Sequence, residues 1–230
     1  MENLKGLNST SSVAGDLVER FGLEHFYLKS DGSLSDGFEI VTHPAPLESH
    51  KGDRVVPWKA LCKFLIESGF TGWQTGTCGL HVHVNRSQFF NRKFLYQYKL
   101  AAAILRLRDF LRVVSGRRSW TYCKLDDIEW DGRLSTVKVA SNAYSDDRYH
   151  AVSFTPYHTV EFRFPRGTLK YECLVGTLEL VALLVEIVND YGLAYITQKL
   201  TVQDVINKAK KNQYRYFFAL LQARGVEVCA

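Results

Sequence analysis

Three short segments of this 230-residue chain place ligand-type polar side chains between apolar ones at a period of two, although Val41 shares the face of Glu39 in the first of them. They are FEIVTH (38–43), LHVHVN (80–85) and HTVEFRFP (158–165). Successive side chains of a β-strand point to opposite faces, so this period predicts strands with one polar and one apolar face. Such strands need a layer of structure packed on their apolar side.

Helical periodicity fills much of the remaining sequence. Apolar residues recur at helical spacing in the segments 12–22, 55–69, 91–113, 170–190, 201–211 and 212–223. The segment HFYLK (25–29) is predicted to pair with 38–43 as an antiparallel hairpin across the turn-rich SDGSLSDG. The region 115–150 is irregular and receives no assignment. This order predicts an α+β fold, a largely antiparallel sheet with helices on one face.

Length and composition indicate one soluble domain covering residues 1–230. Hydrophobic residues make up 46% of the chain and charged residues 23%, which is typical of a globular protein. No apolar run reaches the roughly 18 residues that cross a bilayer, and the N-terminal sequence lacks the features of a signal peptide. We therefore expect a cytoplasmic protein without membrane association. The five cysteines include no CxxC pair, which argues against a zinc ribbon or disulfide framework.

Two of the predicted strands carry candidate ligands for cations or anions. Glu39 lies between Phe38 and Ile40, where a buried carboxylate needs a metal ion or an arginine as partner. An exposed glutamate on an edge strand is the alternative. His81 and His83 leave the same strand face and suit metal ligation or contact with phosphate oxygens. A pair of surface histidines explains the same pattern.

The third strand places an acid and an arginine on one face. Glu161 and Arg163 share that face, Phe162 and Phe164 share the other, and Arg166 follows beyond the strand end. The pair is either a local ion pair or a site where a carboxylate takes a metal ion and a guanidinium takes a phosphoryl group. If the three polar faces coincide, the strands form one platform for anions and metal ions.

Basic residues are concentrated in two stretches of this chain, whose net charge is +5. Arg117 and Arg118 follow a predicted helix and either interact with its C-terminal dipole or grip a nucleotide or substrate. The segment 208–218 mixes basic and aromatic residues, which is compatible with nucleic acid or with a solvated helix face. Nucleic acid is therefore retained as a secondary candidate partner.

Taken in order, DGSL…GFEIVTHP, CGLHVHVN and EFRFPRGTL resemble the amidoligase family over about residues 25–190. The resemblance implies the glutamine synthetase and glutamate–cysteine ligase fold, followed here by a helical segment at about 195–230. It also implies an ATP-dependent carboxylate–amine ligase that uses Mg²⁺ or Mn²⁺ and forms an amide through an acyl phosphate. The substrates would be small-molecule or peptide carboxylates and amines.

Carried over by position, the resemblance assigns a role to each candidate residue. Glu39, His81 and Glu161 resemble metal ligands, and His83 resembles a nucleotide-contacting histidine. Arg163 resembles the arginine on the transferred phosphoryl group, so Glu161 and Arg163 are the expected catalytic pair. Arg166 resembles a residue that contacts phosphate or substrate.

One family feature is missing from the N-terminal part of this sequence. A strand of the type G-x-E-x-E, with two further metal-binding carboxylates, precedes the DGSL segment in the family, whereas the 24 residues before His25 contain no such strand. We therefore expect an N-terminally shortened version of the fold. Either Asp126, Asp127 or Glu129 supplies the ligands, or metal binding is impaired. A partner protein or a second copy would be another way to complete the site. The alternative function is a catalytically impaired protein of a phage or mobile element that binds protein or nucleic acid and inhibits a host system.

Overall fold

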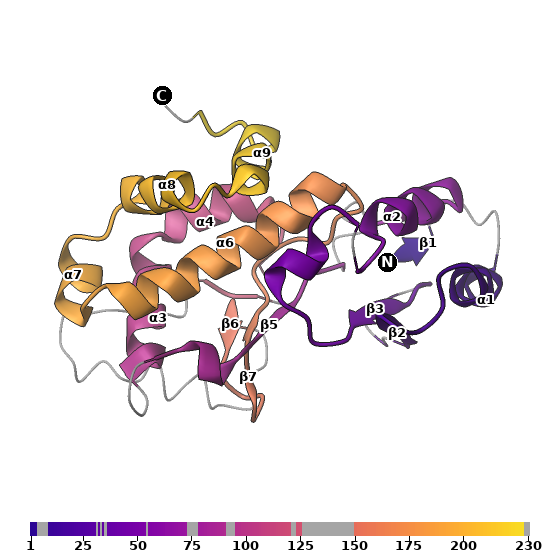
Figure 1. Cartoon of the computed structure of the whole chain (residues 1–230), viewed down its shortest axis with the longest axis horizontal. Helices are drawn as coiled ribbons and strands as arrows, with labels where there is room; N and C mark the ends of the chain where they lie inside the picture. The colour runs from indigo at the N-terminus through magenta and orange to yellow at the C-terminus, as the bar shows by residue number, and fades with distance from the viewer. Residues whose placement is uncertain are drawn as a thin grey trace. The chain divides into compact units, whose positions relative to one another are not determined.

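The computed structural model describes residues 1–3, 9–30, 32, 34, 36–53, 55–72, 78–90, 95–120, 123–125 and 150–227. Asp126, Asp127 and Glu129, named above as substitute ligands, lie outside the described residues. The chain forms two compact units. Unit 1 contains Met1–Gly79 and Arg166–Val175, and unit 2 contains Leu80–Pro165 and Gly176–Ala230. Helices and antiparallel strands occur in both units, which confirms the predicted α+β class (Figure 1).

Unit 1 contains two complete α-helices, one 3₁₀ helix and two small antiparallel sheets among its described residues. Its elements are β1 (Glu2–Asn3), α1 (Thr10–Phe21), β2 (Phe26–Lys29), β3 (Glu39–Thr42), the 3₁₀ helix η1 (Leu47–His50), α2 (Trp58–Glu67) and β4 (Phe70–Thr71). β1 pairs with β4, and β2 pairs with β3 in a register that runs from Phe26 opposite Thr42 to Lys29 opposite Glu39. The predicted hairpin is therefore confirmed.

Apolar residues at helical spacing form the core of unit 1. Val13 and Leu17 of α1 are buried, as are Leu61 and Leu65 of α2. The Ser9 hydroxyl begins α1 by accepting a hydrogen bond from the backbone N–H of Ser12, which satisfies one of the otherwise unpaired amides of the first turn.

Unit 2 contains the three-stranded sheet and most of the helices. Its elements are β5 (Val82–Asn85), the 3₁₀ helix η2 (Arg86–Gln88), α3 (Leu95–Arg106), α4 (Arg108–Ser115), β6 (Val152–Ser153), β7 (Thr159–Phe162), α6 (Tyr171–Asp190), α7 (Leu193–Gln198), α8 (Val202–Lys211) and α9 (Arg215–Ala223). The first five residues of α6 belong to unit 1. β7 lies between β5 and β6 and pairs with both in antiparallel fashion. None of the described helices combines the length and the apolar character that a membrane span requires.

The structure corrects two expectations about the elements. The segment predicted as one helix over 91–113 contains two helices that are separated at Leu107, where the backbone has φ −100° and ψ 9°. Leu107 remains buried along with Leu100, Ile104 and Leu111, so the apolar pattern runs through the break without marking it. The described strands also form three separate sheets, and the strand that carries Glu39 is not in the sheet that carries Glu161.

The helices of unit 2 approach one another closely at Gly176. A Cβ atom built on Gly176 of α6 would collide with the backbone carbonyl of Tyr216 in α9. Glu179, one turn further along α6, accepts a hydrogen bond of 2.6 Å from the backbone N–H of Phe217. A side chain is therefore excluded at 176, and a buried carboxylate caps the start of α9.

Candidate functional site

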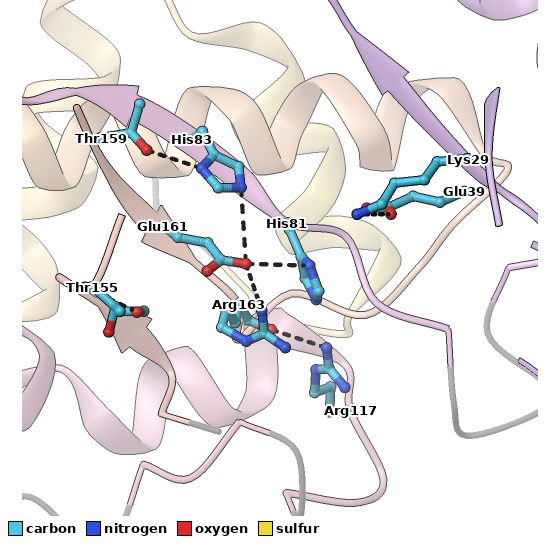
Figure 2. A network of polar contacts seen from close by, with 10 residues as sticks. Lys29, Glu39, His81, His83, Arg117, Thr155, Thr159, Glu161 and Arg163 are labelled. Carbon is cyan, nitrogen blue, oxygen red and sulfur yellow. Dashed lines mark hydrogen bonds and ion pairs between the residues drawn. The ribbon is translucent and has the colours of Figure 1, made fainter. Parts of the chain in front are cut away.

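The candidate site lies on the three-stranded sheet of unit 2 and is centred on Glu161 of β7 (Figure 2). His83 of β5 stands directly opposite Glu161 on one side, and Ser153 of β6 stands opposite it on the other. Residues directly opposite in an antiparallel pair bring their Cβ atoms to within about 5.5 Å on the same sheet face. The register alone therefore brings His83 and Glu161 together.

Three side chains converge on Oε1 of Glu161. Nη1 of Arg163 lies 2.5 Å from it, Nδ1 of His81 lies 3.3 Å from it and Nε2 of His83 lies 3.8 Å from it. The Glu161 side chain is 10% exposed and that of Arg163 is 14% exposed. The sequence prediction that His81 and His83 share a face, and that Glu161 and Arg163 share a face, is confirmed by these contacts. His81 lies just before β5 begins at Val82.

Phenylalanine burial holds β7 in place. Val160, Phe162 and Phe164 are all fully buried, and the Phe162 and Phe164 rings meet edge to face. This agrees with the predicted apolar face of the segment 158–165. Because these side chains anchor the strand, the backbone of Glu161 cannot move away without exposing them. The core thus keeps a charged group in a nearly buried site, where it requires partners.

Thr159 also belongs to the site and was not predicted from the sequence. Its hydroxyl lies 3.0 Å from Nδ1 of His83, so it helps set which nitrogen of that ring carries the proton. Thr159 is two residues before Glu161 and therefore on the same strand face. The alternation Thr159, Glu161, Arg163 was the signal that could have identified it.

Arg117 and Arg118, predicted as nucleotide-gripping residues, differ in their surroundings. Arg117 donates from Nε to the carbonyl of Phe164 at 3.0 Å and from Nη2 to the carbonyl of Arg163 at 2.9 Å. Arg118 is exposed. Burial raises the pKa of the nearby Cys123 thiol, while the positive charges of Arg117 and Arg163 partly oppose that shift. Arg117 thus hydrogen-bonds to the backbone just after β7, at the residue whose side chain contacts Glu161.

Glu39 and Arg166 belong to unit 1. Oε2 of Glu39 lies 3.8 Å from Nζ of Lys29, its cross-strand neighbour in the β2–β3 pair, and the Glu39 side chain is 36% exposed. Arg166 follows the last residue of the unit 2 segment and forms an isolated antiparallel bridge with Gly79. Of the five residues expected on one platform, four meet in unit 2 and Glu39 belongs to a different sheet.

The candidate ligands in unit 2 form a network of charged and polar side chains around Glu161. Within the described part of the chain, no group of three or more His, Cys, Asp or Glu is arranged to hold a metal ion. Glu161 is the one carboxylate of the network, and Arg163 already engages its Oε1. Mg²⁺ in phosphoryl-transfer sites is typically bound by one or two carboxylates together with substrate phosphates. This donor set is therefore compatible with an ion that arrives with a nucleotide.

The basic C-terminal segment makes several contacts within unit 2. Lys208 of α8 pairs with Asp190 and lies 6.0 Å from the centre of the Tyr191 ring. The Arg215 guanidinium lies 4.8 Å from the centre of the Tyr216 ring and donates a hydrogen bond to its hydroxyl. Lys208 thus links α8 to the end of α6, a contact that neither interpretation of this segment, nucleic acid or a solvated helix face, had included.

Comparison with models of known protein families, with curated proteins and with solved structures gave no match. The resemblance to the amidoligase family therefore stays a prediction from the three sequence motifs.

Proposed function

We propose that this chain is an ATP-dependent carboxylate–amine ligase of the amidoligase type. The observation that supports it most is the convergence of His81, His83 and Arg163 on Glu161, because these are the residues to which the motif resemblance assigns metal, nucleotide and phosphoryl contacts. A pair of motifs separated by about 80 positions in the sequence thus forms one polar cluster.

The proposed reaction has two steps. A carboxylate oxygen of the substrate attacks the terminal phosphorus of ATP, and ADP leaves. The amine nitrogen then attacks the acyl carbon of the resulting acyl phosphate, inorganic phosphate leaves, and the amine loses a proton. Both steps build negative charge on phosphoryl oxygens, which fixed positive groups stabilise.

The residues of this chain supply binding and orientation. Arg163 has five N–H donors, of which Nη1 serves Glu161, while its buried Nε has no hydrogen-bond partner among the described residues. Because Nε is buried, the remaining terminal N–H groups of the guanidinium are the ones that would donate to phosphoryl oxygens. His83, with a half-exposed side chain held by Thr159, contacts the nucleotide in this proposal.

A magnesium or manganese ion supplies further neutralisation of phosphate charge when bound. His81 and Glu161 are the residues of unit 2 that would hold it, together with the phosphates that it accompanies. Glu161 also keeps Arg163 in place through their ion pair.

Calorimetric titration with a non-hydrolysable ATP analogue tests the proposal. We expect Mg²⁺-dependent binding that is lost in Arg163→Met and weakened in His81→Ala. His158→Ala is the matched control, because His158 is exposed and adjacent to β7 but alternates away from Glu161. Absence of binding by the unmodified chain, with or without Mg²⁺, would refute the proposal.

The second candidate is a non-catalytic protein of a phage or mobile element that uses this fold to bind protein or nucleic acid. The ion pair between Arg163 and Glu161 favours it, because a carboxylate neutralised by arginine is a weaker ligand for a cation. Amine-dependent release of phosphate from ATP that disappears in Glu161→Gln would exclude it.

A further inference from the structure

The hydrogen bonds of β7 change at Arg163. The backbone amides of Arg163 and Phe164 both donate to the carbonyl of Ala151, at 2.8 and 3.2 Å. Two successive amides on one acceptor are the pattern of a β-bulge, in which one strand holds an extra residue. The pairing of β7 with β5 agrees. Val82 stands opposite Phe162, so a regular ladder would place Leu80 opposite Phe164. The backbone N–H of Leu80 donates instead to the carbonyl of Pro165, which shows one extra residue on the β7 side.

The bulge removes the usual ladder partner of one carbonyl. In a regular ladder the backbone N–H of Ala151 would donate to the carbonyl of Arg163. Here it donates instead to the backbone carbonyl of Lys124, at 3.0 Å. Carbonyls inside a fold need a donor. Arg117 provides it, since its guanidinium donates to the carbonyls of both Arg163 and Phe164.

The local sequence explains why Arg117 reaches this position. Helix α4 ends at Ser115, and Gly116 follows in the left-handed conformation with φ 66° and ψ 17°. That conformation is accessible to glycine at little cost and reverses the chain direction after the helix. The Ser115 hydroxyl then accepts a hydrogen bond from the backbone N–H of Arg117 at 3.3 Å.

We propose that Arg117 is a positioning residue that fixes the β-bulge at Arg163–Phe164 and thereby aims the Arg163 guanidinium at Glu161. A bulge redirects the side chains of the residues within it. The planar fork of arginine can serve two carbonyls at once, which lysine cannot reproduce. The consequence for nucleotide binding rests on the proposed function, whereas the orientation of the Arg163 guanidinium toward Glu161 does not.

Arginine side-chain NMR of the nucleotide-free protein directly tests whether Arg117 sets the orientation of the Arg163 side chain. The Nε–H signal of Arg163, identified by its absence in Arg163→Lys, reports the surroundings of that buried group. We expect this signal to shift or broaden in Arg117→Lys while the backbone amide signals of α8 and α9 stay in place. Arg112→Lys, which makes the same exchange in the last turn of α4, is the control and should leave the signal unchanged. An unchanged Arg163 signal in Arg117→Lys, or collapse of its whole amide spectrum, would overturn the proposal.

A double-mutant cycle on binding of the ATP analogue tests the consequence. Arg117→Lys should weaken binding about tenfold, the factor expected for loss of one interaction of hydrogen-bond strength. The same change made in Arg163→Lys should add almost nothing, because Arg117 acts through Arg163. Additive losses would contradict the positioning role. If the unmodified chain binds no nucleotide, the proposed ligase function fails, and the NMR comparison still decides the role of Arg117.

Discussion

Glu39 and Glu161 both stand on antiparallel strands beside a basic residue, yet their surroundings differ. The Glu39 side chain is 36% exposed and lies 3.8 Å from Lys29. The Glu161 side chain is 10% exposed and is contacted by an arginine and two histidines. β3 has no fully buried residue, whereas the last three residues of β7 are all buried.

The difference shows what makes a strand carboxylate a candidate site. A surface ion pair loses most of its energy to hydration and side-chain entropy. A nearly buried carboxylate is held by the core of its strand and must be satisfied by groups that the fold brings to it. Alternating sequence patterns of the same kind therefore lead to different local chemistry in the two units.

Substituting an apolar or aromatic residue in each of the two strand pairs tests the comparison most strongly. Phe162→Ala should reduce the free energy of unfolding of unit 2 by about 3–5 kcal/mol, because it opens a cavity at a fully buried position. Tyr27→Ala on the β2–β3 pair, where Tyr27 is 44% exposed, should cost less than about 1 kcal/mol. Urea unfolding followed by circular dichroism measures both, and equal losses would show that the two strand pairs are anchored alike.

Neutralising the buried carboxylate should have the next largest effect. Glu161→Gln leaves the Arg163 guanidinium without its ionic partner in a nearly buried site, and we expect a loss of about 3 kcal/mol of unfolding free energy. The double variant Glu161→Gln with Arg163→Met should recover part of that loss, since no unpaired charge remains. Urea unfolding of the single and double variants decides this, and a double variant less stable than Glu161→Gln would contradict it.

A buried histidine makes unit 1 sensitive to acid. Burial lowers the pKa of His50 below its ordinary value of 6.5, and its Nδ1 accepts a hydrogen bond from Nε1 of Trp58 at 3.2 Å. The unfolded chain therefore binds more protons, and the stabilising contribution of neutral His50 is complete above pH 6.5 and is lost as the pH falls toward the folded pKa.

Amide hydrogen-exchange protection factors at pH 7.5 and 5.5 would measure this effect. Protection of α2 should fall at the lower pH in the unmodified chain, and His50→Gln should flatten that dependence. Protection of α3 in unit 2 serves as the internal reference. A pH dependence of α2 that persists in His50→Gln would assign the effect to another group.

The smallest effect is expected at the exposed carboxylate. Glu39→Gln should change the free energy of unfolding by no more than about 1 kcal/mol, and high salt should reduce the difference further. Urea unfolding at low and high salt provides the measurement. A loss comparable to that of Glu161→Gln would show that exposure does not separate the two carboxylates.

The sequence by itself determined the local features of this protein. Alternation in the segment 158–165 placed Glu161 on one face and buried Val160 and Phe162 on the other, because side-chain direction along a regular strand is a property of the backbone. The β2–β3 hairpin and α1, α2, α6 and α8 also followed from periodicity and turn residues. His81 and His83 were correctly placed together for the same reason.

Only the tertiary structure decided how these local features combine. The register of β5 against β7 set His83 opposite Glu161, and no local pattern specifies which strands pair or in what register. The bulge at Arg163 depends on hydrogen bonds from residues distant in sequence, and the break at Leu107 is not marked by the apolar pattern that runs through it. Arg117 lies 46 positions before Arg163, so its contact with that carbonyl arises from the folded chain and from no pattern within either segment.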